Sequence, residues 1–284
     1  MITLTNLLAE GDRSLADFAG SLVLVGAGKM GSAMLDGWLN LGLDFRQVVL
    51  IEPHPSLHIG TFTARGARLN PPPAEVTDAS VVVIAVKPQT ATQAMPQLRA
   101  MAGPTTLVVS IMAGRKMQFV ERALKGRAVI RAMPNLPAAI GRGITVAVAN
   151  KRVTDEQRAL ANKLLSAIGS VEWIDDESLL DAVTAVSGSG PAYLFLLAES
   201  LARAGVAAGL PADLAARLAR ATVTGSAELL HRSPSDPATL RENVTSPGGT
   251  TAAALDVLMN PRGLDALMKK AIAAATKRSR DLAG

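Results

Sequence analysis

The chain has 284 residues, of which 49% are apolar and only 3% aromatic, and it contains no cysteine. This length can bury a sizeable core, and the absence of cysteine excludes disulfides, cysteine-ligated metals and thiol nucleophiles. The formal net charge is +5, but lysine and arginine are scattered and aromatic side chains that could stack on bases are few, so we expect no nucleic-acid partner.

The first twenty residues are predicted to form a short helical extension. They contain Glu10, Asp12, Arg13 and Asp17 and lack the long apolar core of a secretory signal peptide. No stretch of the chain reaches the roughly 20 apolar residues that a membrane span needs. We therefore expect a soluble, cytoplasmic protein that has no membrane partner.

From residue 21 onward, short apolar runs alternate with helical segments. Uniformly apolar runs of this kind are typical of strands buried on both faces of a parallel sheet. Their alternation with helices predicts βαβ units with right-handed crossovers, and hence a doubly wound sheet. The predicted strands are residues 22–26, 48–52, 81–86, 107–111 and 128–131, and residues 143–149 extend the sheet.

The first predicted strand runs directly into a glycine-rich turn that is followed by a helix. This turn has the G-x-G-x-x-G pattern of dinucleotide-binding Rossmann folds, in which the amides at the helix start bind the pyrophosphate. Its six residues are candidate cofactor contacts: Gly26, Ala27, Gly28, Lys29, Met30 and Gly31. The simpler alternative is a glycine-rich turn that binds nothing.

Further cofactor contacts are expected where later strands end, since ligands of such sheets bind at the carboxyl ends of the strands. Glu52 ends the second strand and would accept hydrogen bonds from the adenine ribose hydroxyls and repel a 2′-phosphate, although it could instead be a solvated charge and His54 nearby could still meet a phosphate. Val86, Lys87 and Pro88 follow the strand at 81–86, and Lys87 is equally well explained as an ordinary surface lysine. Ala113 lies in a turn of small residues that would meet the nicotinamide half.

A helix is predicted between residues 154 and 169. Thr154-Asp155-Glu156-Gln157 fits a capping box, and Gly169 stands where a C-terminal cap belongs. Residues 171–174 are predicted to be one last short strand. From residue 175 the strand signals end, and a helical periodicity rich in alanine and leucine continues to the C-terminus.

These patterns predict an α/β chain in three parts. Residues 1–20 are the N-terminal extension, residues 21–174 a Rossmann-like domain, and residues 175–284 a smaller all-α domain. Several of the later helices are apolar over more than one face, which so small a domain can hardly bury alone. We expect a homodimer or a ring of dimers that assembles through the helical domain.

The second half of the chain carries two further motifs. Residues 181–193, DAVTAVSGSGPAY, and residues 244–251, VTSPGGTT, closely resemble signatures of pyrroline-5-carboxylate reductases, and residues 85–88 and 131–137 match that family in order and spacing. The chain departs from the family pattern at Leu136, where a threonine is usual, and near Pro72, where an asparagine often contacts the cofactor. The resemblance implies reduction of a cyclic imine by NAD(P)H to give L-proline.

The resemblance also implies a substrate site. Gly248, Gly249 and Thr250 would hold the substrate carboxylate, and the Thr251 hydroxyl would hydrogen-bond the ring nitrogen as the catalytic orienting group. Independently, two glycines that lead into a helix present unpaired amides to an anion, although the same residues could serve only as a helix cap. Glu177 is carried over as facing the substrate.

Asn243 is carried over as facing the cofactor. The glycines of SGSGP at residues 187–191 could break a helix to admit a ligand, or the break could serve helix packing only. No metal-ligand constellation is visible, and the three histidines lie outside the motifs.

Two other functions compete with the reductase. A β-hydroxyacid dehydrogenase shares the expected plan, but it would carry a catalytic lysine in the stretch comparable to residues 188–193, which has none. A module that senses NAD(P) without turnover would not need the anion-binding loop at residues 246–251.

Overall fold

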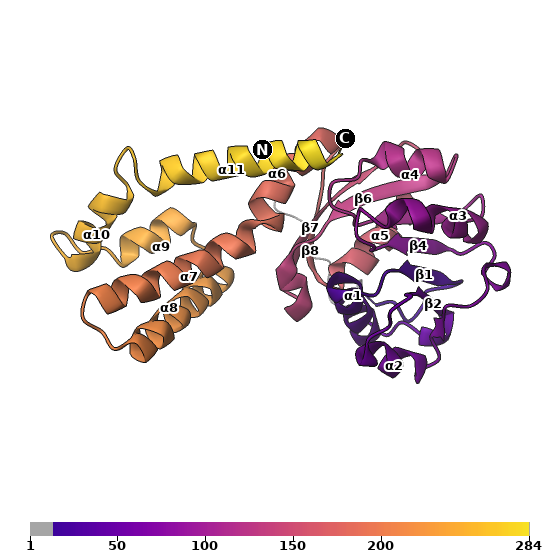
Figure 1. Cartoon of the computed structure of the whole chain (residues 1–284), viewed down its shortest axis with the longest axis horizontal. Helices are drawn as coiled ribbons and strands as arrows, with labels where there is room; N and C mark the ends of the chain where they lie inside the picture. The colour runs from indigo at the N-terminus through magenta and orange to yellow at the C-terminus, as the bar shows by residue number, and fades with distance from the viewer. Residues whose placement is uncertain (1–13, 284) are drawn as a thin grey trace. The chain divides into compact units, whose positions relative to one another are not determined.

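The computed structural model describes residues 14–283 and consists of two compact units (Figure 1). The sheet unit contains the chain up to Gly188 together with the segment from Thr276 onward, and the helical unit is Ser189–Ala275. The sheet unit extends past the domain boundary expected at residue 175, because Leu180 and Ala185 are fully buried and Leu180 packs into a core of the sheet.

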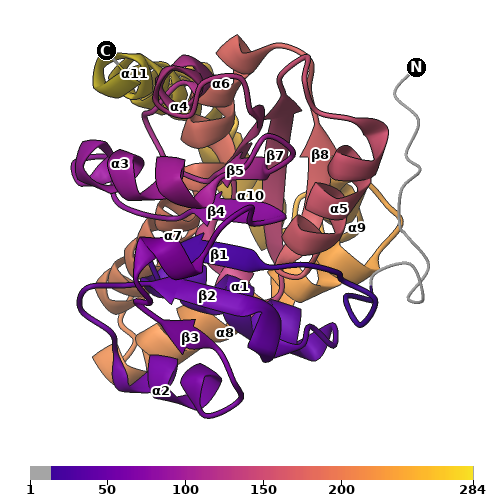
Figure 2. The same cartoon turned by 90° about the vertical axis from the view of Figure 1, so that its right-hand side faces the viewer.

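Within the described residues, the sheet unit is built on eight strands in the order β3-β2-β1-β4-β5-β6-β7-β8. Figure 2 shows the part of this order from β3 through β2, β1 and β4 to β5. Neighbouring strands are parallel except for β6 and β7, which pair antiparallel. The order β3-β2-β1-β4-β5-β6 is that of a doubly wound dinucleotide-binding fold, which confirms the predicted fold class. The strands are Leu22–Val25, Val48–Ile51, Arg68–Leu69, Val81–Ile84, Leu107–Ser110, Ala128–Met133, Gly143–Ala149 and Gly169–Trp173.

Helices cover both faces of this sheet. The strands alternate their side chains between two cores, so that Leu22 and Leu24 of β1 point into one and Val23 and Val25 into the other. The first core is covered by α1 (Lys29–Asn40), α2 (Leu57–Thr63) and α5 (Asp155–Ser166), and the second by α3 (Ala91–Met101), α4 (Met117–Ala123) and α6 (Leu180–Val183). Because helices cover both faces of the sheet, the central strands β1, β2, β4 and β5 are buried along their whole length.

The predicted N-terminal helix is wrong for the part that the structure describes. Residues 1–13 lie outside the described residues, and residues 14–20 form turns and a bend. Leu15 and Phe18 are buried in the first core, and the Leu15 N–H donates to the Leu41 carbonyl oxygen. These contacts with the sheet unit hold residues 14–20 in an irregular conformation. The pattern of residues along the segment does not show such contacts.

The capping box of α5 is confirmed, since the Thr154 hydroxyl accepts from the Gln157 N–H and the Gln157 side chain accepts from the Thr154 N–H. Gly169, however, is not the C-cap, which is Ala167. Gly169 begins β8 with φ +141°, and a Cβ there would collide with the backbone of Gly143. The glycine is needed for close strand pairing rather than for ending the helix.

The helical unit begins where a π-helical turn, Thr184–Gly188, continues into α7 (Gly190–Ala207). Within the motif at residues 187–191, the π turn ends at Gly188, Ser189 is a bend residue with helical φ and ψ, and α7 starts at Gly190 with Pro191 tolerated in its first turn. The other helices are α8 (Ala212–Arg232), α9 (Pro237–Asn243), α10 (Thr250–Leu258) and α11 (Leu264–Ala283), of which the last ends in the sheet unit.

Much of the apolar surface of α7 is exposed within the single chain. Five consecutive or nearly consecutive large side chains are 44–58% exposed: Leu194, Phe195, Leu196, Leu197 and Leu201. By length and composition alone, the helical run Glu177–Ala207 could also cross a membrane, contrary to the expectation from sequence, but helices of soluble proteins meet the same criterion. An exposed apolar face of this size marks an interaction surface.

Candidate active site

The glycine-rich loop joins β1 to α1 where the strand order reverses, at the edge on which such sheets bind ligands. Gly26 has φ +90°, and a Cβ there would lie 2.8 Å from the carbonyl carbon of Ala85. A Cβ on Gly31 would collide with the Gly26 carbonyl oxygen. Gly28 is the N-cap of α1, and a Cβ there would meet no atom within 4 Å. The loop therefore packs tightly against its own fold and leaves open space at Gly28, which fits a pyrophosphate.

The turn after β4 lies beside this loop. The Ala85 N–H donates to the Val25 carbonyl oxygen at 2.7 Å, and a Cβ on Gly26 would lie 2.9 Å from the Val86 nitrogen, so the turn that continues to Lys87 and Pro88 starts next to the glycines. Lys87 is exposed, and the Pro88 carbonyl oxygen accepts from the Arg115 guanidinium at 3.1 Å. The structure thus brings together two of the predicted cofactor segments at the carboxyl edge.

Ala113 lies in the turn after β5 and is exposed. The next residue, Gly114, has φ +66°, and a Cβ there would lie 3.2 Å from Cβ of Leu282, in the last turn of α11. The last turn of α11 therefore packs against the turn at Ala113 and Gly114, which the sequence predicts to meet the nicotinamide half of the cofactor.

Glu52 follows β2 and reaches the glycine-rich loop. Its Oε2 accepts from the Ala27 N–H at 2.8 Å, and its Oε1 accepts from the His54 N–H at 3.0 Å. A carboxylate has about four acceptor sites, so these two bonds leave acceptor capacity for hydroxyl groups. The structure places this carboxylate beside the glycine-rich loop, to which it is hydrogen-bonded.

In the helical unit, the loop Ser246–Gly249 leads into α10. The N-cap is Gly249 and no side chain caps the helix, so neither Thr250 nor Thr251 acts as the capping residue. The Gly249 N–H donates to the Ser246 carbonyl oxygen at 3.0 Å, and Gly248 has φ +69°. Helix geometry leaves the first-turn amides, including those of Thr250 and Thr251, without intrahelical acceptors. Asn243 is the last residue of α9, seven positions before α10 begins.

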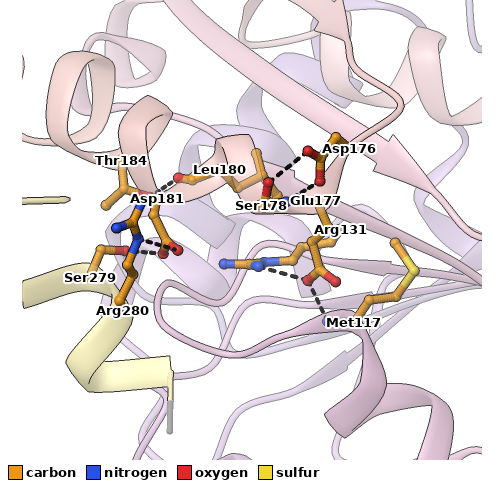
Figure 3. A network of polar contacts seen from close by, with 10 residues as sticks. All are labelled: Met117, Arg131, Asp176, Glu177, Ser178, Leu180, Asp181, Thr184, Ser279 and Arg280. Carbon is orange, nitrogen blue, oxygen red and sulfur yellow. Dashed lines mark hydrogen bonds and ion pairs between the residues drawn. The ribbon is translucent and has the colours of Figure 1, made fainter. Parts of the chain in front are cut away.

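Glu177 lies in a polar network of the sheet unit (Figure 3). Its Oε1 accepts from the Arg131 guanidinium at 2.7 Å and from the Met117 N–H, the first of α4, also at 2.7 Å. The Arg131 side chain is only 6% exposed and that of Glu177 30%. Glu177, which the resemblance implies to face the substrate, is therefore the counter-ion of the buried Arg131. The sequence analysis did not single out Arg131, although an arginine inside an apolar strand is unusual and could have indicated a buried ion pair.

A second polar contact in the same network involves the end of the chain (Figure 3). The buried Ser279 hydroxyl donates to Asp181 Oδ1 at 2.7 Å, and the Arg280 guanidinium lies 3.8 Å from Asp181 Oδ2. Nearby, the Ser178 hydroxyl and N–H both donate to the exposed Asp176 carboxylate and hold its pKa below the ordinary value. The segment Asp176–Asp181 is thus fixed to β6, to α4 and to α11.

Two family models match the chain. The one described as pyrroline-5-carboxylate reductase dimerisation covers residues 177–282. The other, described as NADP oxidoreductase, coenzyme F420-dependent, covers residues 21–114. The two matches coincide with the helical part of the chain and with the strands that surround the glycine-rich loop.

Relatives are similar to the chain over most of its length. The pyrroline-5-carboxylate reductase of Synechocystis sp. is 41% identical over 237 residues, which is 83% of this chain and 88% of that protein. The enzyme of the same name from Pseudomonas aeruginosa is 40% identical over 267 residues, 92% of this chain and 96% of that protein.

Solved structures give the same result. A pyrroline-5-carboxylate reductase from Coxiella burnetii, at 32% identity, superposes with a TM-score of 0.85 over 93% of this chain and 99% of that one. The Plasmodium falciparum pyrroline carboxylate reductase, solved with NADP bound, has a TM-score of 0.77 at 28% identity and covers 93% of this chain and 98% of its own.

Proposed function

The chain belongs to the pyrroline-5-carboxylate reductase family, and we propose that its glycine-rich loop holds NAD(P)H while the loop at residues 246–251 holds the substrate carboxylate. It is an NAD(P)H-dependent oxidoreductase that reduces 1-pyrroline-5-carboxylate to L-proline. The β-hydroxyacid dehydrogenase and the non-catalytic sensor are not supported by any of these relatives.

The geometry of Gly26, Gly28 and Gly31 carries the cofactor assignment. Two of these glycines are needed for packing and the third faces open space at the start of a twelve-residue helix. An anion at that place meets backbone N–H groups and the positive end of the helix dipole. Val86, Lys87, Pro88 and Ala113 are assigned to the same cofactor because their turns lie at the same edge of the sheet, and Asn243 because of the family resemblance.

The substrate assignment rests on the start of α10. The amides of Gly248, Thr250 and Thr251 can donate to a carboxylate, while Gly249 supplies the turn through its bond to Ser246. When bound, NAD(P)H supplies the hydride for the C=N bond. The protein's task is then to position the ring and to anchor its carboxylate, with the Thr251 hydroxyl as the donor to the ring nitrogen.

With Glu52 in this place, the enzyme should work with NADH at least as well as with NADPH. The Glu52 carboxylate is fixed beside the loop, where it can accept from the 2′- and 3′-hydroxyls of the adenine ribose and would repel a 2′-phosphate. The family model at residues 21–114 is described as an NADP oxidoreductase and the Plasmodium falciparum relative was solved with NADP bound, so NADPH is the competing cofactor. The ratio of kcat/KM for the two cofactors tests this assignment.

The assembly is an oligomer, which we propose to be a homodimer or a ring of dimers formed through residues 175–284. The exposed leucines and Phe195 of α7 would be its contact surface, in line with the dimerisation model that covers residues 177–282. We further propose a cytoplasmic location, consistent with biosynthetic relatives.

Loss of reduced-cofactor absorbance on adding 1-pyrroline-5-carboxylate tests the whole assignment. The reductase should oxidise NADH only when this imine is present and should form one proline per cofactor. Oxidised cofactor reduced by a β-hydroxyacid instead, or cofactor binding with no turnover of the imine, would contradict it.

A further inference from the structure

Asn70 has an unusual backbone conformation at the edge of the sheet. It directly follows β3, which has only two residues, and it has φ +48°. Among the described non-glycine residues, it shares a positive φ only with Asp78. Asparagine tolerates this region better than most side chains do, but the conformation still needs compensation from its surroundings.

That compensation comes from three hydrogen bonds to the end of β2. The Asn70 N–H donates to the Leu50 carbonyl oxygen at 2.8 Å. Its side-chain Oδ1 accepts from the Glu52 N–H at 2.8 Å, and its Nδ2 donates to the Glu52 carbonyl oxygen at 2.9 Å. One side-chain amide thus satisfies both backbone groups of Glu52.

The two residues that follow explain why a side chain is needed here. Pro71 and Pro72 have no N–H, so β3 cannot continue the ladder beside β2. The side-chain amide of Asn70 has an N–H donor and a carbonyl acceptor, as a peptide group does. It takes the place of the backbone peptide group that would otherwise pair with Glu52. It extends the ladder by one residue, and that residue is Glu52.

We propose that Asn70 is a positioning residue for cofactor specificity, which it exerts by holding Glu52 in reach of the adenine ribose. The connection is continuous: Asn70 fixes the Glu52 backbone, and the Glu52 carboxylate accepts from the Ala27 N–H of the glycine-rich loop. The inference rests on the proposed role of Glu52 as the ribose acceptor. Asn70 itself needs no contact with the cofactor.

The test compares Asn70→Gly with Glu52→Ala and with Asp78→Gly as the matched control. Glycine keeps the positive φ accessible, so Asn70→Gly removes the side-chain bonds without adding backbone strain. Asp78→Gly makes the same exchange at the other positive-φ position. For each variant, kcat/KM is measured with NADH and with NADPH, and the thermal midpoint is followed by tryptophan fluorescence.

A second readout uses the cofactor-free protein. Hydrogen exchange of the peptide that contains Ala27 reports whether Glu52 still accepts from its N–H. Asn70→Gly and Glu52→Ala should both speed this exchange, and Asp78→Gly should leave it unchanged. This measurement does not depend on activity.

We expect Asn70→Gly to lower the NADH-to-NADPH ratio of kcat/KM by roughly three- to tenfold, in the same direction as Glu52→Ala, with the KM for the imine unchanged. An unchanged ratio in Asn70→Gly, with a lowered ratio in Glu52→Ala, would overturn the role of Asn70 and leave that of Glu52 intact. An unchanged ratio in Glu52→Ala, or a wild-type preference for NADPH, would remove the Glu52 assignment and this inference with it.

Discussion

Replacing Glu177 by alanine should destabilise the sheet unit more than it impairs substrate binding. The change leaves the Arg131 guanidinium, only 6% exposed, without its counter-ion and the Met117 N–H without its acceptor. Removing one partner of a buried ion pair costs about 3–5 kcal/mol. Because Glu177 is itself 30% exposed and water can reach part of the gap, we expect a loss of roughly 2–4 kcal/mol.

Both tryptophans of the chain, Trp38 and Trp173, belong to the sheet unit, so their fluorescence reports its unfolding. At a fixed protein concentration, the urea midpoint of Glu177→Ala should fall by about 1 M. Adding Arg131→Met to this variant should restore part of the stability by removing the unpaired charge. Arg46→Ala, which breaks an exposed ion pair with Asp44, should shift the midpoint little. If Glu177→Ala kept the wild-type midpoint and raised the KM for the imine, the structural role would be refuted and a substrate contact favoured.

Three further predictions concern the loops and the assembly. Gly249→Val should nearly abolish reduction with unchanged cofactor affinity, because the backbone there must come close to the substrate carboxylate and the new Cβ would also crowd the Ser246 carbonyl oxygen at 3.1 Å, and equal loss of both functions would contradict the carboxylate site. Thr251→Val should cost only about two- to tenfold in rate, since one neutral hydrogen bond is worth roughly 0.5–1.5 kcal/mol, and a complete loss in steady-state assays would show a larger role. Phe195→Glu should dissociate the oligomer in light scattering, whereas a wild-type monomer would exclude assembly through α7.

The central strands could be predicted because they are almost entirely apolar, as strands covered on both faces of a sheet are. The predictions extended strands 22–26, 48–52, 81–86 and 107–111 one or two residues beyond their observed ends and stopped strand 128–131 two residues before the end of β6, since the residue pattern does not mark where strand pairing ends. β3 was missed because Arg68–Leu69 is two residues long and half exposed. β3 is recognised as a strand only by its pairing with β2, and a pattern read along one segment does not reveal pairing with another.

The glycine-rich loop could be predicted because its function depends on a local succession of strand, glycines and helix. The partners of Glu177 could not, since Arg131 and Met117 lie 46 and 60 residues away in the chain. Gly169 shows the same limit: its position after a helix suggested a cap, but the nearby Gly143 backbone is what requires a glycine there. The hydrogen bonds from the Asn70 side chain to the Glu52 backbone could not be predicted either, because they depend on the pairing of β2 with β3.

The path of the chain through the two units has a consequence for its synthesis. Residues 189–275 are inserted between two parts of the sheet unit, whose last described contacts are made by Ser279, Arg280 and Leu282. On the ribosome, the sheet unit therefore cannot bury Ser279 against Asp181 until residues 189–275 have been synthesised and Ser279 has left the exit tunnel. These last contacts of the sheet unit form only after the whole of α7 has been synthesised, when its apolar face is already available to a second nascent or completed chain.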